Sequence, residues 1–280
     1  MKTIIKPLLT GVLATLILIL VMLYVTMNFQ ILLVLGSILY FIGGYLNQEY
    51  ANRPVRTVFL IVFIYQTLFI LLVLSELPEL WYFIPFYVIS TAFGLLFKKH
   101  KKQILISGSL NLIIMLLVVF WVIPVNLENR LTKDMYADLP EFTIELVDGE
   151  KISTSALRER IIVLDFFGTW CKPCIQELKE LDEIKNEFDE SEVVFFVVNA
   201  DQGGDTPQKF QAFIDSNNYT FNFGYDHNSK IFKQLNMAHL GLPTLLIIDK
   251  EQKIRLQHVG YNPAETNFKS KMISLINELK

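Results

Sequence analysis

The two cysteines of this 280-residue chain are the residues whose type and spacing point most directly to chemistry. Cys171 and Cys174 are the only cysteines in the sequence, and two residues separate them. A disulfide framework needs more cysteines with wider spacing, and a structural zinc site needs about four ligands. We therefore expect the two cysteines to react with each other, because their sulfur atoms can reach bonding distance within a single turn.

The elements on either side of this pair predict a role for each cysteine. Residues 161–167 form a near-continuous apolar run, which is typical of a strand covered on both faces. Residues 173–188 are expected to form a helix with an apolar face, and Pro173 suits its first turn. Cys171 would then lie at the helix N-terminus, where free N–H groups and the helix dipole favour the thiolate that attacks disulfides. Cys174, one turn further, is expected to be more buried and to resolve the mixed disulfide.

The rest of the second half predicts an α/β fold. Strands are expected over residues 193–199, 244–248 and 254–259. A helix is expected to begin after Asp205-Thr206-Pro207, and another to close the chain over residues 263–280. Alternating strands and helices with buried strands indicate an α/β sandwich.

A family resemblance follows from two segments of this half. Phe166-Phe-Gly-Thr-Trp-Cys-Lys-Pro-Cys174, together with Gly241-Leu-Pro-Thr244, resembles the TlpA/ResA-like branch of the thioredoxin superfamily. The resemblance covers about residues 136–280 and implies a thioredoxin-like fold with a central mixed sheet flanked by helices. It also implies a redox-active disulfide and no cofactor. Members of this branch are extracytoplasmic and mostly reduce disulfides in partner proteins, and several serve cytochrome c maturation.

The resemblance also implies roles for individual residues. Pro243 matches the family's cis-proline, which lies beside the cysteines and leaves a backbone edge for the substrate chain. The residues expected to contact substrate are Trp170, Lys172, Pro173, Leu242 and Pro243.

Two acidic residues complete the expected catalytic set with the cysteines. Glu177, three residues after Cys174, matches the family's partly buried acid, although a solvated helix carboxylate is the plainer interpretation. Asp165, six residues before Cys171, matches the buried aspartate of ordinary thioredoxins. Thioredoxins place a lysine on the next strand, whereas Phe195-Phe-Val-Val198 contains none, so Asp165 is left without an obvious cation.

The first half of the chain predicts a membrane domain. Five apolar runs, each about 18–22 residues long, contain no Lys, Arg, Asp or Glu apart from Arg56 at the start of the third, and match the thickness of a bilayer core. We expect a transmembrane domain over residues 1–126, a linker over 127–137 and the thioredoxin-like domain over 138–280. The five runs cover residues 8–27, 29–46, 55–74, 80–97 and 104–125.

The loop charges predict the orientation of these runs. Lys2 and Lys6 precede the first run, Arg53 lies in the second connection with Arg56 at the start of the third run, and four lysines lie within residues 98–102. The first connection carries no charge, and the third carries Glu76 and Glu79 but no cation. All these cations fall on one side of an alternating path, which the positive-inside rule makes cytoplasmic. The N-terminus would then be cytoplasmic, and the thioredoxin-like domain would lie on the extracytoplasmic, periplasmic side of a bacterial cytoplasmic membrane.

Composition and spacing limit the alternatives. From residue 131 onward, 16 Lys and Arg stand against 24 Asp and Glu, which argues against a nucleic-acid partner. The four histidines show no ligand spacing, so no metal site is expected. A copper chaperone of similar fold would space its cysteines one residue wider and add a specific histidine.

The sequence does not determine the direction of the thiol-disulfide exchange or the partners of the protein. A disulfide oxidase or isomerase uses this fold too, and so could a non-catalytic membrane sensor with a thioredoxin-like binding domain. The expected partners are substrate proteins with disulfides, the lipid bilayer and a separate membrane thiol electron donor. The donor is required of a reductase because the chain has no cysteine outside the Cys171–Cys174 pair.

Overall fold

The computed structural model describes residues 2–72, 74 and 80–280, without the side chains of residues 2, 3, 130 and 131. Its residues group into two compact units, Met1–Asn126 and Leu127–Lys280. Glu76 and Glu79 of the third connection, and residue 73 of the third expected run, lie outside the described residues.

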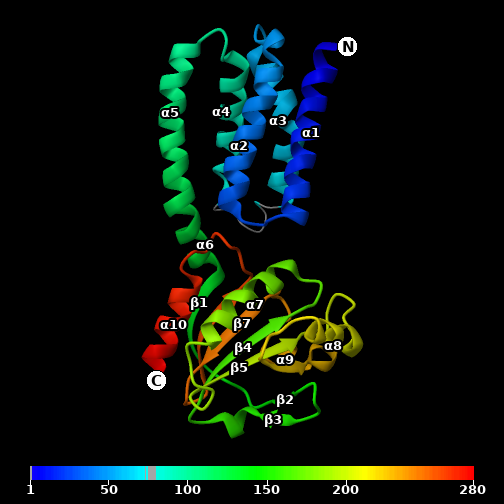
Figure 1. Cartoon of the computed structure of the whole chain (residues 1–280), viewed down its shortest axis with the longest axis vertical. Helices are drawn as coiled ribbons and strands as arrows, with labels where there is room; N and C mark the ends of the chain where they lie inside the picture. Colours follow the sequence, from blue (N-terminus) through cyan, green and yellow to red (C-terminus); the bar gives the residue numbers. More distant parts are fainter. Residues whose placement is uncertain (1, 73, 75–79) are drawn as a thin grey trace. The chain divides into compact units, whose positions relative to one another are not determined.

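The first unit is built from helices (Figure 1). Four helices are long and apolar enough to cross a membrane, counting the continuous helical stretch Lys101–Asn129 as one. The elements are α1 Lys2–Tyr24, α2 Phe29–Leu46, η1 Gln48–Tyr50, α3 Pro54–Leu72, α4 Phe83–Leu96, α5 Lys101–Leu117, the π-helical turn η3 Val118–Val122, and α6 Ile123–Leu131, which continues into the second unit.

The fourth expected run is shorter than a full span, because Leu80–Tyr82 forms a turn before the helix. α4 has 14 residues, or about 21 Å at 1.5 Å per residue, against a hydrocarbon core of about 30 Å. It nevertheless runs parallel to α2 along nearly the whole of that helix: Phe83 contacts Phe29 at one end, and Gly94 meets Phe41 at the other. Gly44 and Gly94 permit this approach, because a Cβ atom at either would collide with a backbone carbonyl of the facing helix.

The second unit contains a six-stranded mixed sheet in the order β1-β8-β7-β4-β5-β6. β4, β5 and β6 are parallel, whereas β7 is antiparallel to β4, and β8 is antiparallel to both β7 and β1. The strands are β1 Thr132–Asp138, β4 Ile161–Phe167, β5 Val193–Asn199, β6 Asn222–Tyr225, β7 Thr244–Ile248 and β8 Lys253–Val259, with a separate hairpin of β2 Thr143–Glu145 and β3 Lys151–Ser153.

Helices cover both faces of this sheet (Figure 1). One face packs against apolar side chains of α7, α8 and α10, and this core contains both cysteines. The other face packs against β2, η4 and α9. The helical elements are η4 Thr154–Leu157, α7 Lys172–Lys185, α8 Pro207–Asp215, η5 His227–Ser229, α9 Lys230–Gln234 and α10 Phe268–Leu279.

The expected thioredoxin-like fold is confirmed, with two differences in its elements. The linker expected over residues 127–137 is wrong, because this stretch belongs to α6 and to β1. β1 is an edge strand held by backbone pairing with β8, and most of its side chains are exposed, so it carries no apolar pattern. The closing helix begins at Phe268 instead of Pro263, because Asn262 forms a turn with the backbone N–H of Ala264.

Candidate redox site

Cys171 and Cys174 form a disulfide at the start of α7, with Cα atoms 5.2 Å apart. Cys171 is the N-cap of the helix, and its sulfur accepts a hydrogen bond from the backbone N–H of Cys174 at 3.3 Å. Pro173 lies in the first helical turn, where its missing N–H costs no hydrogen bond. A thiolate on Cys171 would thus lie among free N–H groups at the positive end of the helix dipole.

The two sulfur-bearing residues differ in access to solvent. Cys171 is 4% exposed, whereas Cys174 is completely buried. The difference is small, but it agrees with the assignment of Cys171 as the attacking cysteine and Cys174 as the resolving one.

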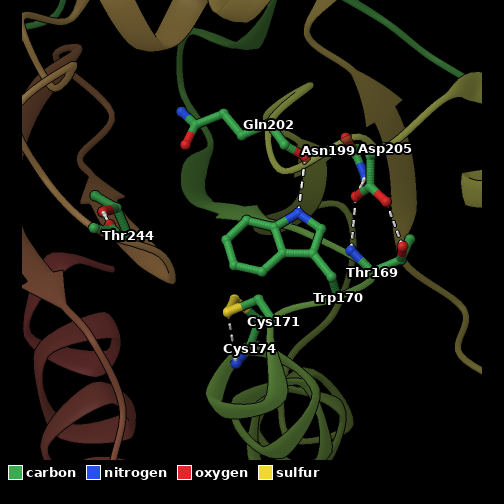
Figure 2. The surroundings of a disulfide bond; sticks show 9 residues. Thr169, Trp170, Cys171, Cys174, Asn199, Gln202, Asp205 and Thr244 are labelled. Carbon is green, nitrogen blue, oxygen red and sulfur yellow. Dashed lines mark hydrogen bonds between the residues drawn. A yellow bond between two sulfur atoms is a disulfide. The ribbon is translucent and has the colours of Figure 1, made fainter.

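Trp170 covers the approach to the pair and remains half exposed (Figure 2). Its indole N–H donates to the carbonyl oxygen of Gln202 at 2.8 Å. The ring lies directly against Gly203, where any Cβ atom would collide with it, and the φ of +64° at Gly203 also favours glycine. Trp170 therefore presents a fixed apolar surface beside the disulfide.

Asp205 fixes the loop that carries the redox pair (Figure 2). Its Oδ2 accepts hydrogen bonds from the backbone N–H of Thr169 at 2.8 Å and from the side-chain amide of Asn199 at 2.7 Å. Its Oδ1 accepts from the Thr169 hydroxyl. Asp205 is thus committed to this loop, and Thr206 is the residue that caps α8, accepting from the N–H of Lys209 at 3.2 Å.

The segment before β7 supplies the expected proline. The Leu242–Pro243 peptide bond is cis, as the sequence predicts. Pro243 is buried, Gly241 is exposed, and Leu242 is half-buried and packs against the core that contains both cysteines. Lys172 is also half-buried, in the first turn of α7.

Both expected acids are fully buried. Asp165 lies in β4, and neither of its carboxylate oxygens has a hydrogen-bond donor among the described residues. Burial, and then the nearby charge of Glu177, raise the pKa of Asp165 well above its ordinary value. Glu177 lies on α7, and burial raises its pKa as well, although His258 opposes that rise. The solvated-helix interpretation of Glu177 is therefore wrong.

His258 and Glu265 are neighbours of this acid pair that the sequence patterns did not single out. His258 lies fully buried in β8, with Nε2 2.9 Å from Oε2 of Glu265 and Nδ1 3.2 Å from Oε1 of Glu177. One signal for it was present: Ile254, Leu256 and His258 alternate along β8, and this period of two places them on the buried face. In the part of the chain that the structure describes, no group of three or more His, Cys, Asp or Glu side chains is arranged to hold a metal ion.

Comparison with known proteins finds the same chemistry in relatives of the second unit. Residues 136–257 match the model of the AhpC/TSA family. The thiol-disulfide oxidoreductase ResA of Bacillus thuringiensis is 29% identical over 128 residues, which cover 46% of this chain and 71% of ResA. The thioredoxin-like protein YneN of Bacillus subtilis is 30% identical over 123 residues, which cover 43% of this chain and 69% of YneN.

Two solved structures of bacterial proteins are also similar to part of this chain. StoA from Bacillus subtilis has 24% sequence identity and a TM-score of 0.40, covering 46% of this chain and 95% of StoA. The exposed lipoprotein thioredoxin Etrx1 from Streptococcus pneumoniae has 25% identity and a TM-score of 0.41, covering 50% of this chain and all of that one.

Proposed function

The chain belongs to the ResA-like branch of the thioredoxin-like thiol-disulfide oxidoreductases, and we propose that it reduces disulfides of partner proteins outside the cytoplasm while anchored in the membrane. The observation that carries this proposal is the Cys171–Cys174 disulfide at the start of α7. The same helix carries the buried carboxyl group of Glu177, three residues after Cys174. This arrangement supplies a nucleophile, a resolving thiol and a proton acceptor within the first two turns of α7.

The proposed reaction begins with the reduced pair. The Cys171 thiolate attacks one sulfur of a substrate disulfide, forms a mixed disulfide, and releases the other substrate sulfur as a thiolate. Cys174 then gives its proton to the buried acid pair of Asp165 and Glu177 and attacks the sulfur of Cys171. The second substrate sulfur leaves as a thiolate, so the substrate gains two electrons and the Cys171–Cys174 disulfide forms.

The surface around the pair supports an extended substrate segment. The half-exposed Trp170 ring and the half-buried Leu242 offer apolar contacts, and Lys172, Pro173 and the edge before Pro243 complete the rim. Such a surface would bind a substrate through its backbone and through apolar contacts. It therefore suits substrates that are recognised by their disulfide and not by a particular amino-acid sequence.

The proposed location rests on the helices and loop charges of the first unit. Lys6 forms an ion pair with Glu49 at 2.7 Å, and Lys98 lies over the ring of Tyr45 at the end of α2, so these cations gather at one end of the bundle. The positive-inside rule makes that end cytoplasmic. With α4 crossing beside α2, five crossings carry the chain from this end to an extracytoplasmic second unit.

The direction of the reaction is tested by the reduction potential of the full-length chain in detergent, equilibrated with glutathione buffers. A reductase is expected near the thioredoxin value of about −270 mV, whereas an oxidase lies near about −120 mV. The same preparation should reduce insulin when supplied with a thiol reductant. Failure to reduce any protein disulfide would instead favour a sensor that binds without turnover.

The partner is identified by trapping. A Cys174→Ser chain cannot resolve its mixed disulfide, so it should retain the substrate on Cys171 for mass spectrometry. Apocytochrome c, whose haem-attachment cysteines must be reduced, is the substrate that the family resemblance suggests. A separate membrane thiol protein must return the pair to its reduced state, since the chain has no further cysteine.

A further inference from the structure

His258 lies in the same row of the sheet as Asp165. Asp165 of β4 pairs with Leu245 of β7, which in turn pairs with His258 of β8. Directly paired residues project to the same face, so these side chains share the face that α7 and α10 cover. The carboxyl group of Glu177, on the helix α7 that covers this face, contacts His258.

Each nitrogen of the His258 ring faces a carboxyl group. Nε2 lies 2.9 Å and 3.1 Å from the two carboxylate oxygens of Glu265, within hydrogen-bond distance of both. Nδ1 lies 3.2 Å from Oε1 of Glu177, but the N–H is not aligned with that oxygen, so this contact is an ion pair. A neutral imidazole carries hydrogen on only one nitrogen and would turn a lone pair toward one of the carboxylates. The geometry therefore favours the imidazolium.

The charges agree with this geometry. Burial by itself lowers the pKa of His258, but the contacts with Glu177 and Glu265 outweigh burial and raise it to about 9. In return, His258 lowers the pKa of Glu177 against the effects of burial and of Glu265. Asp165 has no such cation, and burial raises its pKa well above its ordinary value. The two buried acids thus differ, because only Glu177 has a neighbouring cation that opposes the rise of its pKa.

Other titratable groups surround this site from the neighbouring elements. Burial raises the pKa of the Tyr261 hydroxyl, and the negative charges of the nearby glutamates raise it further. These glutamates are Glu180, Glu177, Glu265 and Glu183. Glu183 forms an ion pair with Lys269 of α10 at 2.7 Å. The His258 ring also contacts Phe268, an uncharged neighbour with ring centroids 4.9 Å apart. From β7 and β1 the paired neighbours are Leu245 and Thr132, which do not titrate.

We propose that His258, anchored by Glu265, is a positioning residue that keeps Glu177 ionised and ready to take the proton of Cys174. This inference rests on the proposed function and names the group that prepares its proton acceptor. In the step concerned, the S–H bond of Cys174 breaks and its proton moves to Glu177. The S–S bond between Cys174 and Cys171 forms, and the substrate sulfur departs with the electron pair of the broken mixed disulfide.

The test compares resolution rates over a pH series for the full-length chain in detergent. The reduced chain is mixed with a disulfide-bonded peptide and quenched with acid, and mass spectrometry follows the decay of the mixed disulfide. His258→Gln should slow resolution near pH 7 about tenfold, the effect of one pKa unit, and should move the profile to higher pH. Glu265→Gln should move the profile in the same direction by less. The matched control is His239→Gln, since His239 is exposed and should leave the profile unchanged.

A second background separates positioning from a structural role. In a Glu177→Gln chain the acceptor is absent, so His258→Gln should produce no further shift in the pH profile. A shift of equal size in both backgrounds, or an unshifted profile for both His258→Gln and Glu265→Gln, would overturn the inference. If His258→Gln does not fold, the Glu265→Gln profile decides alone. Disulfide reduction by the parent chain is measured first: its absence refutes the proposed function, whereas normal reduction with unshifted variants refutes only the role of His258.

Discussion

Cys174 and Glu177 lie three residues apart on α7, and both side chains are fully buried. This spacing places them on one face of the helix. The Cys174 sulfur, which must lose a proton during resolution, therefore lies in the same buried region as the carboxyl group of Glu177. Burial raises the pKa of that carboxyl group. A proton acceptor works best when its pKa lies near the working pH, and burial moves an ordinary glutamate toward that range.

The first prediction is that Glu177→Gln and Asp165→Asn each slow resolution of the mixed disulfide near neutral pH. Both changes keep the shape of the side chain and remove its titration. We expect a loss of about 100-fold, the lower end of the range for a general base. The loss should shrink at high pH, where Cys174 ionises without help.

The control for these variants is Glu187→Gln, because Glu187 lies just beyond α7 and is exposed. It should resolve at the parental rate throughout. If both acid variants also resolve at the parental rate over the whole pH range, the two carboxyls are structural groups and not proton acceptors.

The second prediction concerns the two cysteines. Because Cys171 is the N-cap of α7 and keeps some exposure, alkylation of the reduced chain at mildly acidic pH should modify Cys171 first. Peptide mapping after a short iodoacetamide pulse measures this order. Faster modification of Cys174 would reverse the assigned roles.

Much of this site could be predicted from the sequence, because its strands carry strong local patterns. β4 and β5 are buried on both faces, so each is a continuous apolar run. The ends of these runs predict the first and last residues of both strands. β1 and β6 are short or exposed edge strands whose positions depend on pairing with β8 and β5, and no local pattern indicates them.

The residues that sequence patterns missed act through contacts between distant segments. Asp205 comes directly before Thr206 and Pro207, where α8 begins, yet its carboxylate accepts a hydrogen bond from the backbone N–H of Thr169, 36 residues away. His258 and Glu265 form their contacts only when β8 lies beside β7 under α7. Spacing along the chain carries little information about such contacts, and the alternation of buried residues along β8 is the signal that could have indicated a buried His258.

The third prediction is that the second unit loses stability as the pH rises. The pKa of His258 is raised from 6.5 to about 9 in the fold, so its contribution is complete below about pH 6.5 and disappears as the pH passes about 9. The raised pKa values of Asp165 and Glu177 act in the same direction, because a protonated acid tolerates burial better than a charged one. The loss should be on the order of 1–3 kcal/mol.

Calorimetry of the full-length chain between pH 6 and pH 10 measures this loss. His258→Gln should flatten the pH dependence of the melting temperature of the second unit, while His239→Gln should retain it. A parental melting temperature that rises over this pH range would contradict the assigned directions.

The fourth prediction concerns Asp205. Asp205→Ala removes the acceptor of two donors from Thr169 and one from Asn199, all near the redox loop. Buried donors without a partner cost about 1–3 kcal/mol, so the free energy of unfolding should fall by about that amount. The first attack on substrate should also slow, because the loop that positions Cys171 is released. Asp215→Ala, at an exposed position on α8, is the control and should change neither quantity.

The fifth prediction concerns topology, which depends on whether α4 crosses the membrane. By length alone α4 falls short, and a chain with four crossings would leave the second unit on the same side as Arg53, which precedes α3. The parallel contact of α4 with α2, from Phe83 beside Phe29 to Gly94 beside Phe41, instead indicates that both helices cover the same depth. Five crossings then place Arg53 and the redox unit on opposite sides of the membrane.

Single reporter cysteines distinguish these two topologies in a chain lacking Cys171 and Cys174. Arg53→Cys and Asp148→Cys both lie at exposed positions, one just before α3 and one in the β2–β3 hairpin. In intact spheroplasts, a membrane-impermeant maleimide should label Asp148→Cys at once and should label Arg53→Cys only after the membrane is permeabilised. Equal labelling, or equal protection, of the two before permeabilisation would mean that α4 does not cross. Protection of Asp148→Cys with free labelling of Arg53→Cys would invert the orientation and place the redox pair in the reducing cytoplasm, where an extracytoplasmic role is impossible.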